Sequence, residues 1–110
     1  MRQSHTAVVE RDVTWAGAFE TEPYEAAWAR EAVYFIRFMA REGDTARGSA
    51  RVQISPDGMH WCDEGASVEF GGDADVVFVR VRHFGTYLRL TGEVPADASV
   101  RVLVYLTLKS

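Results

Sequence analysis

The segment Ile54–Gly65, ISPDGMHWCDEG, holds the densest group of reactive side chains in this 110-residue chain. Cys62 could act as a nucleophile with His60 as its base, because residues two apart share one face of a strand. A reactive thiol also needs a local field that lowers its pKa, and the segment offers no recognisable third orienting group. The alternative is a hairpin, with Asp57 and Gly58 in the turn, Trp61 packed on the core and Cys62 as a small strand residue. We therefore predict a turn here and no catalytic residue.

The remaining metal-binding side chains lack the spacing of a known site. Five carboxylates near predicted loops could bind calcium, but without EF-hand spacing: Asp57, Asp63, Glu64, Asp73 and Asp75. The three histidines are far apart, whereas a cupin-type site draws on close-set histidines: His5, His60 and His83. His83 has the parity of Val77, Val79 and Val81, so we expect it at the edge of the core. We predict no metal and no cofactor; a small metal-dependent enzyme using His60 or His83 is the least favoured alternative.

Length and composition indicate one globular domain spanning residues 1–110. Apolar residues make up 47% of the chain and charged residues 25%, which is ordinary for such a domain. The net charge of −4 argues against a nucleic-acid partner. One cysteine excludes an internal disulfide, and no signal-like leader or long apolar run is visible. We expect a cytoplasmic or virion-associated protein without a membrane partner.

The second half of the chain is typical of short strands separated by Gly, Pro and Asp. Val52 and Ile54 alternate with polar residues, and Val100 to Lys109 alternates almost without interruption. The predicted strands are 50–55, 61–65, 66–70, 76–84, 87–91 and 100–109. We predict an all-β fold: an antiparallel β-sandwich or jelly roll of about eight strands in two sheets.

The first half is open to two interpretations. Residues 6–15 predict one or two strands. Residues 21–43 could form a helix, because Thr21 could cap it, Pro23 suits its first turn and Gly43 could end it. Aromatic and β-branched residues are dense between Ala32 and Met39, however, and such density favours a strand. We prefer two strands, over 24–29 and 32–40.

The outward positions of the last strands predict an interaction face. Arginine and tyrosine alternate there with aliphatic residues, and eleven of the twelve Lys and Arg residues of the chain are arginine. Protein interfaces are enriched in Tyr and Arg and depleted in Lys. Besides Val76, the predicted interface residues are Phe78, Arg80, Arg82, Tyr87, Arg89, Arg101, Leu103 and Tyr105. Such a face could join copies of the protein or a larger assembly, or it could be covered by the N-terminal segment of the same chain.

Aromatic residues suggest an alternative partner, a glycan. They make up 12% of the chain and include Trp15, Trp28 and Trp61. Sugars stack on exposed aromatic rings, although tryptophans in a small sandwich also serve as core residues. The preferred function is thus a non-catalytic structural or interaction module that self-associates, and the alternative is a carbohydrate-binding module.

The C-terminal half also resembles small β-sandwich modules of phage virion and bacterial surface proteins. In these a strand leads into a Ser-x-Asp-Gly turn followed by Trp, here Ser55, Asp57, Gly58 and Trp61. Later an aromatic-Gly-x-aromatic-Leu-Arg strand precedes the last long strand, here Phe84, Gly85, Tyr87, Leu88 and Arg89. The resemblance implies a discoidin-like or jelly-roll sandwich and supplies no catalytic residues.

Overall fold

The structure is a computed structural model that describes residues 3–82 and 84–110. Over these ranges the chain forms nine strands and one short 3-10 helix, Thr45–Arg47. The strands are β1 Ser4–Trp15, β2 Ala18–Glu20, β3 Tyr24–Glu25, β4 Glu31–Glu42, β5 Ser49–Ser55, β6 Cys62–Glu69, β7 Val76–Arg82, β8 Tyr87–Glu93 and β9 Ser99–Lys109.

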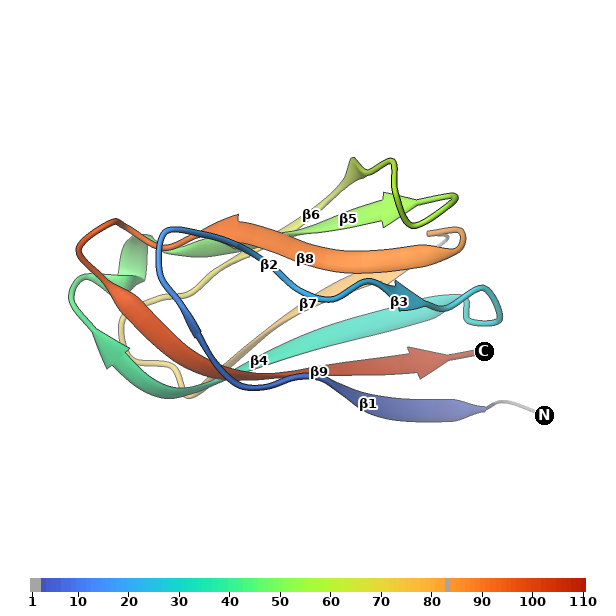
Figure 1. Ribbon diagram of the computed structural model, residues 1–110. Helices are drawn as coiled ribbons and strands as arrows, with labels where there is room; N and C mark the ends of the chain where they lie inside the picture. Colours follow the sequence, from blue (N-terminus) through green and yellow to red (C-terminus); the bar gives the residue numbers. More distant parts are fainter. Residues whose placement is uncertain (1–2, 83) are drawn as a thin grey trace.

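The strands pair into two antiparallel sheets that pack face to face (Figure 1). The four-stranded sheet has the order β1-β9-β4-β7. The five-stranded sheet has the order β2-β8-β5-β6, with β3 also paired to β8. The prediction of an antiparallel β-sandwich is confirmed, with one strand more than the eight expected.

Alternating apolar residues place the core between the sheets. On β9 the inward residues are all 1% exposed or less: Val100, Val102, Val104, Leu106 and Leu108. Leu88 and Leu90 of β8 face them from the other sheet and are fully buried. The predicted alternation of the last strand is therefore confirmed.

Residues 21–43 form strands, as preferred over the helix. The first is shorter than predicted: β3 covers two residues, and the chain then turns through residues 27–28. The second, β4, is longer and pairs with β9 on one side and β7 on the other. Its inward Tyr34 and Ile36 are fully buried, and its outward Phe35 is half-buried. The inward parity is apolar because it faces the core, whereas the outward parity, with Val33 and Phe35, lies on the outer side of the sheet.

Several strand boundaries differ from the prediction. The segments 61–65 and 66–70 form one strand, β6, because Gly65 adopts φ +118° and lets the strand continue through a change of register. The predicted strand 76–84 ends at Arg82. Glycine therefore bends β6 without ending it.

One end of the core is aromatic. Trp15 is 4% exposed and stacks on Phe19, with ring centroids 3.8 Å apart. Phe70 lies 6.1 Å from both rings. Gly92 is the register partner of Phe19, and a Cβ there would lie 2.8 Å from the Phe19 ring, so this close packing needs glycine. Of the three tryptophans, Trp15 is the one in the core.

Candidate interaction face

The outward side of the four-stranded sheet carries a row of apolar residues that crosses every strand. Phe35 of β4 is the register partner of Phe78 on β7 and of Tyr105 on β9. Tyr105 in turn pairs with Val8 on β1. We call these four residues the aromatic row. Phe78 is 48% exposed and Val8 40%, so both ends of the row are open to solvent.

Further apolar side chains extend the aromatic row along the strands. Val33 and Leu103 are half-buried on the same side, and Val76 is 48% exposed. Among the described residues, four of the six exposed large apolar side chains lie on this side of the sandwich: Val8, Met39, Val76 and Phe78. Monomeric proteins seldom leave a continuous apolar patch in water. We call the whole surface the outer face.

The outer face is cationic in a chain whose net charge is −4. Its cations surround the apolar patch: Arg37, Arg80, Arg82, Arg101 and Lys109. The guanidinium of Arg80 lies 5.0 Å from the centre of the Phe78 ring. Arg101 is paired with Asp12 of β1 at 3.1 Å, and both side chains are about half exposed. Arginine next to aromatic rings is the composition of an interface centre.

The structure divides the predicted interface set between two surfaces. Six residues share the outer face of the four-stranded sheet: Phe78, Arg80, Arg82, Arg101, Leu103 and Tyr105. Tyr87 and Arg89 lie on β8, which belongs to the other sheet, so the prediction of one common face is wrong for these two. Parity along a strand identifies its outward side chains but not its sheet, and the chain crosses between sheets after β7. Val8, Val33, Phe35 and Arg37 were missed because they lie in the first half of the chain.

The described N-terminal segment from Ser4 to Glu25 lies within the two sheets and covers neither outer surface. β1 lies beside β9 within the four-stranded sheet, and β2 and β3 both pair with β8 within the other sheet. The alternative explanation of the outward apolar residues, that the chain covers its own face, is therefore wrong for the segment from Ser4 to Glu25.

The outer surface of the five-stranded sheet is organised around Arg89. Its guanidinium lies 4.3 Å from the Trp61 ring centroid, Nε donates to Gln53 at 2.8 Å, and Nη1 pairs with Glu20 at 2.9 Å. Trp61 is half-buried in this contact and does not reach the core, so its prediction as a core residue is wrong. The side chain of Arg89 is only 19% exposed, which makes this arginine part of the fold.

The turn after β5 is built by Ser55 and Asp57. Ser55 Oγ accepts the amide of Gly58 at 2.8 Å, and Asp57 Oδ1 accepts the amides of Met59 and His60, each at 2.9 Å. The His60 and Met59 amides hold the pKa of Asp57 well below that of a free aspartate. Gly58 adopts φ +79°, which confirms its predicted place in the turn.

The reactive side chains of this segment are engaged in the turn or exposed. The His60 imidazole pairs with Asp57 Oδ2 at 2.6 Å. Cys62 is exposed, and its Sγ lies 3.6 Å from the carbonyl oxygen of Ile54. Asp63 accepts from Gln53 and Arg51, and the Gln53 contact contributes most to lowering its pKa. These contacts hold the turn and strand β6 in place.

Histidines and carboxylates do not converge in the described part of the chain. Within residues 3–82 and 84–110, no three His, Cys, Asp or Glu side chains are placed to hold a metal ion. His5 is exposed on β1, and His83, expected at the edge of the core, lies outside the described residues. In the same ranges no helix has the length and apolar character required to cross a membrane.

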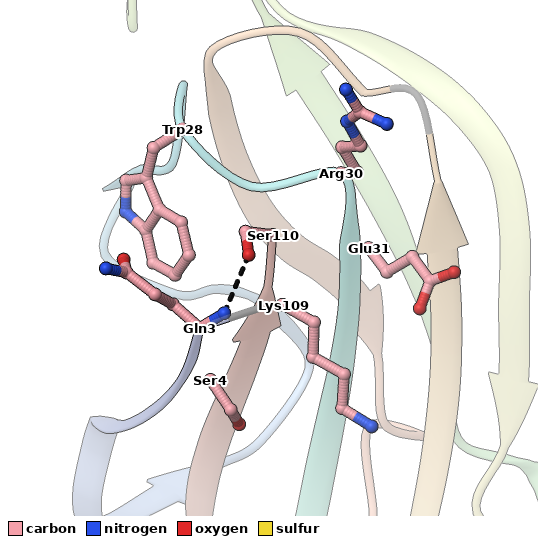
Figure 2. Close-up of a pocket in the computed structure, with 7 residues that line it drawn as sticks. All are labelled: Gln3, Ser4, Trp28, Arg30, Glu31, Lys109 and Ser110. Carbon is pink, nitrogen blue, oxygen red and sulfur yellow. Dashed lines mark hydrogen bonds between the residues drawn. The ribbon is translucent and has the colours of Figure 1, made fainter. Parts of the chain in front are cut away.

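A pocket of about 780 Å³ lies where both chain ends meet the turn before β4 (Figure 2). It is lined by Gln3, Ser4, Trp28, Arg30, Glu31, Lys109 and Ser110. Trp28 is 44% exposed. Figure 2 shows Trp28 on one side of the pocket and the charged ends of Glu31 and Lys109 on the other. The pocket therefore combines an open aromatic ring with cationic and acidic groups.

Comparison with known proteins assigns the class of fold: a small two-sheet antiparallel sandwich module of the kind found in phage proteins and carbohydrate-binding modules. The SPBc2 prophage-derived protein YomS matches with a TM-score of 0.65 and 9% identity, over 100% of this chain and 96% of YomS. The PBSX exported protein XepA matches with a TM-score of 0.69 and 10% identity, over 94% of this chain and 36% of XepA. TmCBM61, solved in complex with β-1,4-galactotriose, matches with a TM-score of 0.51 and 13% identity, over 96% of this chain and 86% of TmCBM61.

These identities establish a shared fold. The resemblance of the C-terminal half to phage and bacterial sandwich modules is confirmed and extends to nearly the whole chain. The chain spans about a third of the length of XepA. No protein-family model and no characterised protein sequence matches the chain.

Proposed function

We propose that this protein is a non-catalytic structural or interaction module that self-associates through the outer face of its four-stranded sheet. The observation that carries the proposal is the aromatic row, which crosses all four strands and ends in Phe78 and Val8, 48% and 40% exposed. Burying such side chains against a second molecule removes apolar area from water, at about 25 cal/mol per Å². Arginines beside the row match the enrichment of arginine at protein interfaces.

The fold comparison supports a role in an assembly. YomS is prophage-derived, and XepA is an exported protein of PBSX. We infer the same setting for this module: it is part of a phage particle, or it is an exported protein encoded by a phage genome. Interaction through an outer sheet face leaves the loops at both ends of the sandwich free for other contacts.

Light scattering on the purified protein at micromolar concentration tests the proposal. We expect a discrete oligomer, and we expect Phe78→Glu to give a monomer because it places a charge in the aromatic row. Tyr87→Glu is the matched control, since Tyr87 is on the other sheet and should leave the oligomer intact. A clean monomer of the unmodified protein, or equal dissociation by both variants, overturns the proposal.

A second candidate function, carbohydrate binding, is favoured by the pocket at Trp28. An exposed indole flanked by Gln3, Arg30 and Glu31 has the elements of a sugar site, an aromatic platform with orienting polar groups. TmCBM61 binds β-1,4-galactotriose on a similar fold. A glycan array followed by tryptophan fluorescence titration tests this candidate. Binding that Trp28→Ala abolishes and Trp61→Ala preserves supports it, and an array without response removes it.

A further inference from the structure

The outer face ends in a short row of charges. Glu31 of β4 is the register partner of Arg82 on β7 and of Lys109 on β9. Glu31 and Lys109 are both exposed, and their strands are the two central ones of the sheet. Four residues away on the same strands lie Phe35 and Tyr105, the centre of the aromatic row. The order of charges and rings along β4 and β9 restricts how two copies can pack.

Two sheets in aligned face-to-face packing keep their strands within about 30° of one another. A two-fold contact between two outer faces then has two arrangements, with the axis close to the strand direction or close to perpendicular to it. An axis along the strands, between β4 and β9, places each residue of β4 over its own register partner on β9 of the second copy. An axis across the strands, along the aromatic row, instead places each strand over the same strand of the second copy, running in the opposite direction.

The first arrangement matches charges and apolar groups. Glu31 faces Lys109 of the second copy, Phe35 faces Tyr105, and Arg37 faces Leu103, because these are register partners within the sheet. At the sheet edges, β7 lies over β1 of the second copy. Arg80 and Arg82 then face the uncharged side chains of Thr6 and Ser4. No cation among these residues faces another cation.

The second arrangement opposes like charges. Reversal about the aromatic row brings Lys109 over Arg101 of the second copy, since these residues lie four positions on either side of Tyr105. It also places Val33 over Arg37 and leaves Glu31 without an opposing cation. Asp12 pairs with Arg101 and offsets part of this like-charge opposition. The first arrangement opposes no cations among these residues and pairs Glu31 with Lys109, so charge favours it.

We propose that two copies pack outer face to outer face around a two-fold axis that runs along the strands between β4 and β9. Glu31 and Lys109 of the two copies then alternate around the axis, and Phe35 packs on Tyr105 of the second copy. This inference rests on the proposed function, because it describes the geometry of that self-association.

Charge reversal in trans tests the geometry. In a dimer of the Glu31→Lys variant, two pairs of lysines face each other across the axis. In a dimer of the Lys109→Glu variant, two pairs of glutamates do so. We expect each variant alone to raise the dimer dissociation constant at least about tenfold. An equimolar mixture restores opposite charges across the axis, so heterodimers should form with close to the affinity of the unmodified protein. Native mass spectrometry with one variant ¹⁵N-labelled measures the heterodimer, and sedimentation velocity measures the dissociation constants.

The outcomes separate the two proposals. Because Glu31 and Lys109 also neighbour each other within one copy, a purely intramolecular effect would persist in the mixture. A dimer that both single variants leave intact, or a mixture without heterodimers, overturns the two-fold geometry while self-association stands. An unmodified protein that is monomeric at all concentrations overturns both. Near-ultraviolet circular dichroism of each exposed-site variant verifies the fold.

Discussion

The guanidinium of Arg89 stacks on the ring of Trp61, with 4.3 Å between its Cζ and the ring centroid. The same side chain donates to Gln53 on β5 and pairs with Glu20 on β2. Arg89 of β8 thus contacts the turn after β5, the neighbouring strand β5 and the three-residue edge strand β2. The predicted turn after β5 is held against the sheet by this contact.

Replacing Arg89 by lysine should destabilise the fold. An ammonium group cannot stack flat on Trp61 while it bonds to both Gln53 and Glu20. We expect Arg89→Lys to lower the free energy of unfolding by about 1–2 kcal/mol, measured by urea denaturation. Arg51→Lys is the control, because the Arg51–Asp63 pair is about half exposed and should contribute little to stability. Equal losses in both variants would contradict this role of Arg89.

Asp57 should make the turn sensitive to acid. The amides of His60 and Met59 lower the pKa of its carboxyl group, so the ionised form stabilises the folded state. That contribution is complete above the ordinary aspartate pKa and is lost as the pH falls below it, toward the folded pKa. Asp57→Asn should therefore be less stable than the unmodified protein at pH 7, and the difference should shrink below about pH 4. Urea denaturation at pH 7, 5 and 3 measures it; a constant difference refutes the linkage.

Tyr34 buries a hydroxyl group that has no hydrogen-bond partner among the described residues. Its side chain is fully buried, and burial raises the pKa of the phenol. Tyr34→Phe should raise the free energy of unfolding by about 1 kcal/mol at pH 7, because an unsatisfied polar group leaves the core.

Tyr34 also predicts how stability changes at alkaline pH. Burial keeps the phenol of Tyr34 protonated in the folded state, whereas the unfolded chain loses this proton at about pH 10, the ordinary tyrosine pKa. The stability of the folded state therefore does not depend on this group below about pH 10 and falls as the pH rises above that value. Tyr34→Phe should therefore lose stability less steeply than the unmodified protein between about pH 10 and 11. Thermal denaturation across this range measures the slope, and identical slopes would refute the assignment.

Gly92 should not tolerate a methyl group. A Cβ at this position would lie 2.8 Å from the Phe19 ring and 2.9 Å from Ala50 Cα, and backbone cannot move aside easily. We expect Gly92→Ala to cost about 2–3 kcal/mol, measured by thermal or urea denaturation. Gly72→Ala is the matched control, because its nearest neighbour would be Ala46 Cβ at 3.9 Å. A neutral Gly92→Ala would show that β2 and β8 can separate without loss.

Periodicity of two along the chain was enough to predict the fold class. It indicated which residues of β9 are buried, because side chains alternate between the faces of a sheet. Turn chemistry was enough to place Asp57 and Gly58, since the requirement for positive φ is local. The aromatic Ala32–Met39 segment also favoured a strand before any packing was known.

Pairing between distant strands decided the interaction face. Sequence alone determined that Arg80, Tyr87 and Tyr105 point outward, because outward position depends only on alternation along each strand. It did not determine that Tyr87 lies on the other sheet or that Val8 and Phe35 complete the aromatic row. Those relationships depend on which strands become neighbours, and this follows from the packing of the whole core. Trp61 shows the same limit: its proximity to Arg89 arises only when β8 pairs with β5.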